Sequence, residues 1–367
     1  MGANRNHGLI VGNYCHDVLI KDDVVLAQTL GGAVSFIASV LDGFNISANY
    51  VSKVGSDFSY NNQLNHPPIV SQSEKTTVFH AYFVSDPSEI RREDRVLKKI
   101  RSCDPILATD LPDEVNFSFG MAVGIGGEIS PETLEKMLDI CEVVFVDIQA
   151  LIRDFDEIDG TVKLVNLKDT KFAHLIPRIG FLKASAEEAP YVDVDEVRKF
   201  CCVVVTSGKD GCTVYWKDGE MQISPFSTVQ VDPTGAGDSF LGGLVAGLVE
   251  GLKVPDAAMV GNFFGSLTVG QIGPPELDSR LMQKVKDEVR TRKMQCDEHD
   301  DESRFTKPSG HEQFIASLSA AKLVTARTVS PNVGHEVLDP NLGYTSNQMF
   351  CNNSIYEEPI KSIDAKP

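Results

Sequence analysis

The sequence lacks the features that mark membrane, secreted and nucleic-acid-binding proteins. No stretch of its 367 residues approaches the ~20 consecutive apolar residues that span a bilayer. Its 8 cysteines are scattered without a Cys-x-x-Cys pair, so neither a disulfide framework nor a zinc site is expected. With 34 basic and 52 acidic residues, the net charge of −18 disfavours nucleic acid and anionic membranes as partners. We therefore expect a cytoplasmic protein, either a monomer or a homodimer.

Short apolar runs alternate with helix-like stretches along most of the chain. The strand candidates are 8–13, 48–54, 117–124, 143–147, 179–183 and 203–206, and helix-like stretches include 33–41, 131–141 and 193–200. This alternation predicts an α/β fold whose mostly parallel central sheet has helices on both faces. The amphipathic stretches near 17–30 and 76–84 do not suit a fully buried sheet, and predict a small β-strand lid.

The character of the chain changes near residue 295. The last core-like helix is expected at 279–293, and residues 296–367 contain 11 acidic but only 6 basic residues with thinly spread apolar ones. Such segments bury too little surface to offset the entropy of ordering. We expect one domain over 1–295 and a mostly disordered acidic, polar tail over 296–367, in which only 312–323 suits a short helix. Truncation near 295 is therefore predicted to leave a folded, active protein.

The most informative stretch is 231–243, which reads VDPTGAGDSFLGG. A strand-like segment, 227–231, precedes it, and a helix of small residues, 239–248, follows. The backbone amides of Gly235, Ala236 and Gly237 would converge at the start of this helix, whose dipole favours a bound anion. A carboxylate at the same place, Asp238, suits an acceptor of a hydroxyl proton beside a transferring phosphoryl group.

Two plainer interpretations of this stretch compete with an anion hole. It resembles an ordinary glycine-rich helix start with Asp near the N-cap, which needs no catalytic role. A P-loop would need GxxxxGK[S/T], which is absent, and no GxGxxG follows the first strand, which disfavours a dinucleotide-dependent oxidoreductase.

The 232–243 stretch resembles the C-terminal signature of the PfkB, or ribokinase-like, carbohydrate kinases. Other motifs of that family follow in its order over about 8–285. These are Gly12 with Asp17, Gly31-Gly32-Ala33, Val-Gly-Ser-Asp at 54–57, Gly127-Glu128, Asp147-x-Gln149, LKASAEE at 182–188 and TSGKDG at 206–211. The resemblance implies a three-layer sandwich with a β-strand lid, and a kinase domain over 1–295.

The resemblance also implies roles for particular residues. Asp238 would be the general base, kept ionised by the helix N-terminus, and Gly235, Ala236 and Gly237 would form the anion hole. The donor would be ATP with Mg²⁺, and Glu188 would hold the metal's water shell. The nucleotide would meet Ser207, Gly208, Lys209, Gly211, Thr234 and Asn262. The acceptor would meet Asp17, Gly31, Gly32, Ser35 and Asp57.

Each of these assignments has a plainer alternative. Glu188 also suits a solvated helix start, Asp57 a turn, and 207–211 a hairpin turn, and Asn262 equally suits an ordinary polar helix position.

Two departures from the family bear on the substrate. Ser185 stands where the family usually has Asn, which leaves details of metal or phosphate binding open. Ser35 also replaces Asn, which argues against ribose in its usual pose. No motif places a cation for a phosphate on the acceptor, although Lys53, Arg91 and Arg92 remain candidates. A small neutral polyol is therefore the expected partner.

Three features are most similar to the plant family members that phosphorylate myo-inositol at the 3-hydroxyl. They are the opening GNYCHD, the strand VDIQALIR and the acidic tail. Ribose, fructose and adenosine remain alternative acceptors. A catalytically silent binding protein is a further alternative, which the intact Asp238 and Gly-Ala-Gly disfavour.

Overall fold

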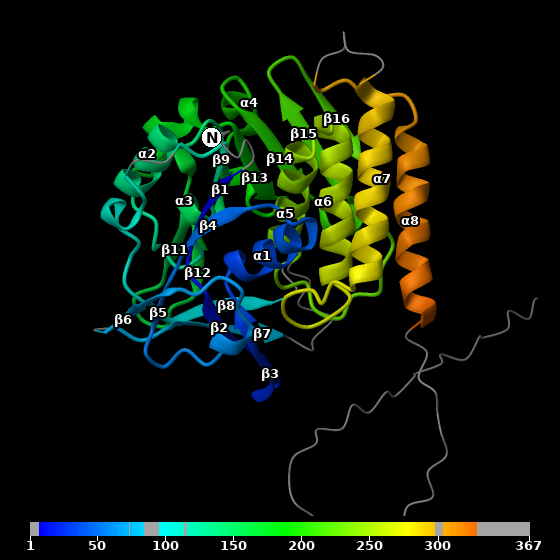
Figure 1. The fold of residues 1–367 in the computed structure, drawn as a ribbon. Coiled ribbons are helices and arrows are strands. Elements are labelled where there is room, and N and C mark those ends of the chain that lie inside the picture. Colours follow the sequence, from blue (N-terminus) through cyan, green and yellow to red (C-terminus); the bar gives the residue numbers. More distant parts are fainter. Residues whose placement is uncertain (1–6, 73, 84–94, 114–115, 298–303, 329–367) are drawn as a thin grey trace, which may run out of the picture. The chain divides into compact units, whose positions relative to one another are not determined.

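The structure, a computed structural model, describes residues 7–72, 74–83, 95–113, 116–297 and 304–328. Its centre is an eight-stranded sheet in the order β16-β15-β14-β13-β10-β9-β1-β4 (Figure 1). These strands are β1 (Gly8–Val11), β4 (Ala48–Val51), β9 (Phe119–Ala122), β10 (Val144–Asp147), β13 (Phe181–Ser185), β14 (Cys202–Thr206), β15 (Cys212–Trp216) and β16 (Gly219–Ile223). Six strands run parallel, and β15 and β16 add an antiparallel edge.

Helices cover both faces of this sheet. One face carries α1 (Ala33–Phe44), α5 (Ala236–Val249), α6 (Val254–Thr268), α7 (Ser279–Asp297) and α8 (His311–Thr328), and the other α2 (Pro131–Ile140), α3 (Gln149–Ile152) and α4 (Val194–Val197) (Figure 1). Side chains of a strand alternate between faces, so Ile10 joins one hydrophobic cluster whereas Leu9 and Val11 join the other. The predicted three-layer α/β architecture is confirmed.

A second sheet forms the predicted lid. It contains β2 (Cys15–Lys21), β3 (Val24–Gly31), β7 (Thr77–Phe83) and β8 (Val96–Arg101), in the order β3-β2-β7-β8. Strands β2 and β7 pair in parallel, and the outer pairs are antiparallel. The sequence indicated the first three strands and missed β8.

Shorter elements complete the fold. The strand pairs are β5 (Lys53–Gly55) with β6 (Ile69–Ser71), and β11 (Arg153–Phe155) with β12 (Val162–Leu164). The 3₁₀ helices are Asn61–Gln63, Ala108–Asp110, Leu167–Asp169, Ala173–Arg178, Ala189–Tyr191 and Gly208–Asp210. In the described part of the chain, no helix combines the length and apolarity that crossing a membrane requires.

Local signals at helix starts were reliable, but the strand predicted at 227–231 is wrong. The Ser130 hydroxyl accepts a hydrogen bond from the Thr133 amide at 3.2 Å and caps α2, with Pro131 in the first turn. In contrast, 224–230 has no regular structure, and Val229 is 81% exposed. An apolar β-branched run was mistaken for a strand, although its side chains have no sheet to pack against.

The predicted domain end at 295 is also wrong, because α8 packs onto the core. Phe314 and Leu318 are buried in the same cluster as α6 and α7. At the start of α8, the Nδ1 atom of His311 lies 2.5 Å from Asp256 Oδ1, and Arg292 Nε lies 2.7 Å from Asp256 Oδ2. The compact unit ends at 328. The rest of the predicted tail, 329–367, lies outside the described residues.

Truncation before α8 should therefore destabilise the protein rather than leave it unchanged. A chain ending at 297 loses the burial of Phe314 and Leu318, each worth about 1.5–3 kcal/mol. We expect its free energy of unfolding to fall by about 3–6 kcal/mol relative to a chain ending at 328. Urea unfolding of the two chains measures this difference. Equal stabilities would show that α8 contributes nothing to the core.

Candidate active site

The start of α5 has the backbone geometry on which the predicted anion hole depends, with one difference from the expected set of amides. Gly235 caps the helix at φ 74°, and a Cβ there would lie 2.1 Å from the Phe36 ring. Glycine is therefore required both by the backbone conformation and by the lack of space for a side chain. The Ala236 amide donates to Pro233 O at 3.3 Å. The amides of Gly237 and Asp238 have no acceptor among the described residues. An anion hole at this helix start would therefore be built mainly from the amides that follow Ala236.

Asp238 lies beside these amides in the first turn of α5. Its Oδ1 atom accepts a hydrogen bond from Gln149 Nε2 at 3.0 Å. Burial raises the pKa of Asp238, against the opposing effects of Lys183, Arg153 and the Gln149 hydrogen bond. Burial therefore outweighs the stabilisation of the carboxylate that we expected from the helix N-terminus. A raised pKa brings the carboxylate closer to the range in which a general base is effective.

The sequence missed a cation beneath the anion hole. Lys183, in the middle of β13, is buried, and its Nζ atom lies 3.0 Å from Asp147 Oδ2. A Cβ added to Gly237 would lie 2.7 Å from that Nζ, which shows how closely the lysine approaches α5. Burial raises the pKa of Asp147 to about 7 even though Lys183 opposes the shift. The motif alone predicted no lysine here, because none follows the glycines and Lys183 comes from a strand distant in sequence.

Glu188 is buried rather than solvated, which removes its plainer alternative. Its Oε2 atom accepts a hydrogen bond from the Ser185 amide at 2.8 Å, and its own amide donates to Ser185 Oγ at 3.3 Å. Serine in place of the family's Asn thus holds this turn. The described residues contain no group of three or more metal-binding side chains. A single carboxylate beside the anion hole suits Mg²⁺ that keeps most of its water ligands.

A small pocket lies on the lid side of α5. It has a volume of about 70 Å³, and its lining includes Asp17, Gly32, Thr234, Gly235 and Asp238. The structure therefore brings together the predicted base and the predicted acceptor carboxylate. Thr234, expected at the nucleotide, lines this pocket instead, because its hydroxyl donates to Asp232 Oδ1 at 2.7 Å and is held on the lid side.

Asp17 is held by its immediate neighbours. Its Oδ1 atom accepts a hydrogen bond from the Cys15 thiol at 3.0 Å. A Cβ on Gly31 would lie 2.2 Å from the carboxyl carbon, so glycine leaves room for the carboxylate. Burial raises the pKa of Asp17 to about 6.

Three predicted acceptor residues, Gly31, Ser35 and Asp57, do not line this pocket. The buried Ser35 hydroxyl donates to Gly32 O at 2.7 Å and so supports the glycine turn from behind. Asp57 accepts two hydrogen bonds from Thr76, each 2.8 Å, and pairs with Arg101 at 2.9 Å. Its carboxylate is therefore used to hold the base of the lid.

Two arginines that the sequence did not single out line the pocket instead. Arg95 precedes β8, donates to the Thr234 hydroxyl and lies 3.8 Å from Asp232 Oδ1. Arg153 opens β11. Of the cations considered from the sequence, Lys53 pairs with Asp110 at 2.7 Å, and Arg91 and Arg92 lie outside the described residues.

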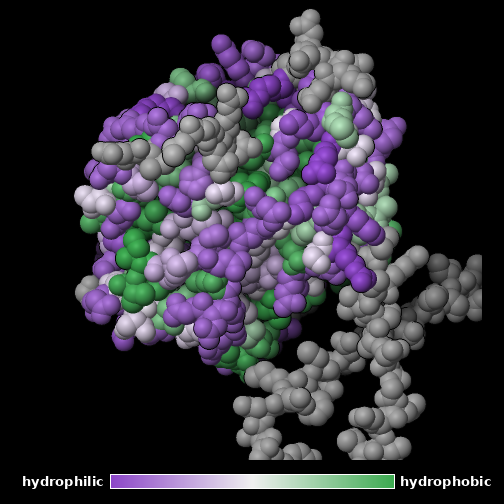
Figure 2. Space-filling view, in the orientation of Figure 1, coloured by the Kyte–Doolittle hydropathy of each residue, from purple (hydrophilic) through white to green (hydrophobic). Residues whose placement is uncertain are grey.

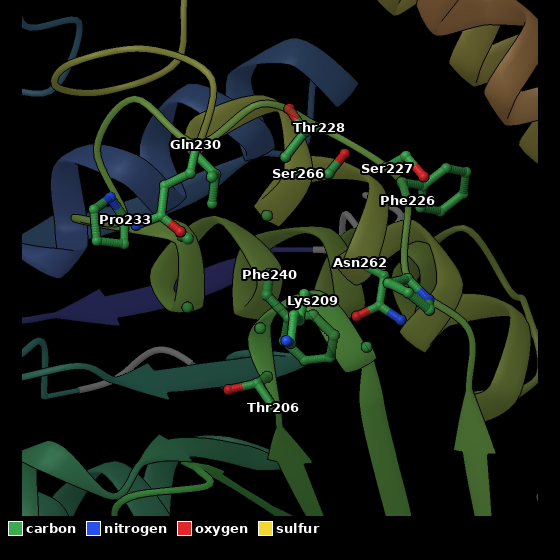
Figure 3. A pocket seen from close by; sticks show the side chains of 17 residues that line it. Thr206, Lys209, Phe226, Ser227, Thr228, Gln230, Pro233, Phe240, Asn262 and Ser266 are labelled. Atoms are coloured by element: carbon green, nitrogen blue, oxygen red, sulfur yellow. The ribbon is translucent and has the colours of Figure 1, made fainter. Parts of the chain in front are cut away.

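A larger cavity, of about 490 Å³, lies on the other side of the α5 N-terminus (Figure 3). Its lining includes Gly208, Lys209, Gly211 and Asn262 from the predicted nucleotide set, together with Ala236 and Gly237. Further lining residues that the sequence missed include Phe226, Ser227, Thr228, Phe240 and Ser266. Most of these follow β16, where a strand was wrongly expected. Ser207 is absent from the lining, because its amide closes the turn onto Gly211 O at 2.8 Å.

The face of the molecule shown in Figure 2 is largely hydrophilic, with apolar side chains scattered over it. This agrees with the net charge of −18. The cations that matter for phosphate chemistry are therefore those placed at the α5 N-terminus rather than those of a basic face.

The chain is similar in sequence to plant inositol kinases. It is 58% identical over 314 residues to the inositol 3-kinase of Arabidopsis thaliana, covering 86% of this chain and 87% of that protein. It is 46% identical over 342 residues to the inositol 3-kinase of Oryza sativa subsp. japonica, covering 90% and 86%. Residues 168–279 match the pfkB family carbohydrate kinases.

Solved structures show the same fold at low sequence identity. A pyrophosphate-dependent kinase in the ribokinase family, complexed with a pyrophosphate analog and myo-inositol, has a TM-score of 0.62 at 16% identity, covering 73% of this chain and 97% of that one. A fructokinase from Vibrio cholerae O395, bound to fructose, ADP and calcium ion, has a TM-score of 0.57 at 16% identity, covering 74% and 97%. With the sequence relatives, these findings establish that the chain is a kinase belonging to the pfkB family of carbohydrate kinases.

Proposed function

We propose that this kinase transfers the γ-phosphoryl group of ATP to the 3-hydroxyl of myo-inositol. The observation that carries the proposal is the position of the α5 N-terminus between the two cavities. Ala236 and Gly237 line the larger one, and Gly235 and Asp238 line the smaller one. A donor in the first and an acceptor in the second would meet at the anion hole, with the base on the acceptor side. The 46–58% identity to plant inositol 3-kinases supports this acceptor.

The larger cavity favours a nucleotide as the donor. Its volume of about 490 Å³ lies within the ~300–1,000 Å³ typical of small-molecule sites. Phe226 and Phe240 supply aromatic surface for a base, while Lys209 and the amides of α5 suit phosphates. Pyrophosphate is the alternative donor, because a neighbour of the same fold uses it with myo-inositol. Aromatic side chains in the cavity wall would not contribute to the binding of pyrophosphate, so they favour a nucleotide.

The residues around the start of α5 would have different roles in phosphoryl transfer. Asp238 would accept the proton of the attacking hydroxyl, and Gln149 would hold the carboxylate in position. The free amides of α5, with Lys183 beneath and Arg95 on the lid side, would stabilise charge on the transferring group. Bound Mg²⁺ would neutralise the phosphates of the donor, with Glu188 as the carboxylate facing its water shell.

The acceptor pocket suits a neutral polyol. Arg95 and Arg153 face the carboxylates of Asp17 and Asp238, so the pocket holds no excess positive charge for an acceptor phosphate. Asp17 can accept hydrogen bonds from hydroxyls of the ring. Ser35 does not line the pocket and contributes nothing to this choice. The pocket measures about 70 Å³, and the lid residues Asp17, Phe79 and Leu97 form part of its lining.

Replacing Asp238 with Asn should abolish turnover and leave donor binding nearly intact. The amide has the size of the carboxylate but cannot accept the proton, and loss of a general base costs about 10²–10⁴-fold in kcat. Steady-state kinetics and calorimetric ADP binding measure the two effects. The matched control is Asp218→Asn, at an exposed turn between β15 and β16. A kcat for Asp238→Asn within a few-fold of wild type would exclude the assignment.

Specificity constants should be highest for myo-inositol with ATP. A site that hydrogen-bonds every hydroxyl rejects analogues lacking one by up to ~10⁴-fold. The panel contains myo-inositol, ribose, fructose, fructose 6-phosphate and adenosine, each tested with ATP and with pyrophosphate under the same conditions. A higher constant for another acceptor overturns the acceptor, and faster transfer from pyrophosphate overturns the donor. Absence of transfer with every pair would favour a silent binding protein.

The KM for the acceptor should rise as the pH falls below about 6. Burial raises the pKa of Asp17 to about 6, so the carboxylate is ionised above this pH and protonated below it. Protonation removes an acceptor of hydrogen bonds from the polyol. KM measured between pH 5 and 8 should therefore depend on pH in the wild type and much less in Asp17→Asn. A wild-type KM that stays flat across this range would contradict the role of Asp17.

A further inference from the structure

Helix α8 reaches the wall of the donor cavity. The Nζ atom of Lys322 donates to Ser227 O at 3.1 Å and to Ser266 Oγ at 2.9 Å. Ser227 and Ser266 both line the cavity, whereas Lys322 does not. In Figure 3 the two serines lie on one side of the cavity, and Thr206 and Lys209 lie on the other. A residue from beyond the predicted domain thus holds two cavity-lining residues together.

The wall that Lys322 contacts has little backbone support of its own. Residues 224–230 form neither helix nor strand. Asn262 of α6 donates to Ile223 O and Ser224 O at 3.3 and 2.9 Å, which fixes the start of this segment. Lys322 fixes it three residues further on. Because no sheet ladder holds this backbone, these side-chain hydrogen bonds determine where the wall lies.

Helix α8 is itself held firmly enough to position that wall. Its first residue, His311, contacts Asp256, near the start of α6, and Lys322 contacts Ser266, near the end of the same helix. Asp256 and Ser266 are ten residues apart, which corresponds to about 15 Å along the helix. Fixed at both ends against α6, α8 provides a rigid base for the lysine.

We infer that Lys322 is a positioning residue for the nucleoside part of the donor, and that α8 belongs to the donor site. This inference rests on the proposed use of ATP. The two hydrogen bonds of Lys322 described above go to Ser227 and Ser266 and not to Lys209, Ala236 or Gly237, which line the phosphate end of the cavity. Loss of the lysine should therefore weaken nucleotide binding and spare pyrophosphate binding, acceptor binding and the transfer step.

Lys322→Met tests this by keeping the apolar stem and removing the donor of both hydrogen bonds. We expect the Kd for MgADP and the KM for ATP to rise about tenfold, the scale of a lost charged hydrogen bond. The kcat, the KM for the acceptor and the Kd for pyrophosphate should stay within about twofold of wild type. Lys322→Arg should recover part of the nucleotide affinity. The matched control is Lys307→Met, which removes a more exposed lysine paired with Glu312 at the start of α8.

The outcomes separate the inference from the proposed function. An unchanged KM for ATP in Lys322→Met, with wild type using ATP, overturns the inference alone. A parallel loss of nucleotide and pyrophosphate affinity with a lower Tm assigns Lys322 a general structural role and also overturns it. A wild-type chain that binds pyrophosphate but no nucleotide overturns the proposed donor, and this inference with it.

Discussion

The site depends on the compensation of buried negative charges by a buried lysine at the start of α5. The carboxylates of Asp147, Glu188 and Asp238 lie near one another in a region from which most water is excluded, and Lys183 is the buried cation that offsets them. Uncompensated buried carboxylates would take up protons or destabilise the fold. The lysine lies so close to α5 that Gly237 leaves no space for a side chain. The small residues at the helix start thus leave space for the Asp147–Lys183 ion pair, and they would also leave space for a transferring phosphoryl group.

The fold places this charge cluster between two different chemical environments. Asp147 is the last residue of β10 and pairs with Lys183 of β13, so the two lie near the carboxyl edge of the sheet, where ligands bind in open parallel sheets. On the proposed donor side, the turn after β14, the segment that follows β16, and helices α5 and α6 line a large cavity with aromatic side chains in its walls. On the acceptor side, the lid brings Asp17 and Arg95 over the helix start. A nearly balanced set of charges there would favour hydroxyl groups over phosphates, so we expect the lid residues to contribute to the specificity of the proposed acceptor site.

Sequence reasoning succeeded where a short motif determines its own geometry. The glycines at 235–237 and the carboxylate of Asp238 are local to one helix start, and Asp17 follows the first buried strand, so their positions could be predicted. Ser35 and Asp57 lie off the small pocket, because their side chains bind Gly32 and Thr76, and the sequence does not reveal these hydrogen bonds. Lys183, Arg95 and Arg153 were missed for the same reason, since each enters the site from an element distant in sequence.

The C-terminal helix shows why composition alone misplaced the domain end. Large apolar side chains are few in α8, and a helix with so few of them bears little sign of burial in its sequence. The contacts that hold α8 on the core are in part polar and join residues distant in sequence. His311 contacts Asp256, which also binds Arg292. Three charged or titratable groups thus satisfy one another in a buried interface. Lys322 extends the same principle to the donor cavity, where a wall without regular structure depends on hydrogen bonds from a neighbouring helix. The segment 296–367, whose acidic composition suggested a mostly disordered tail, therefore includes α8, a helix that would help to shape the proposed donor site.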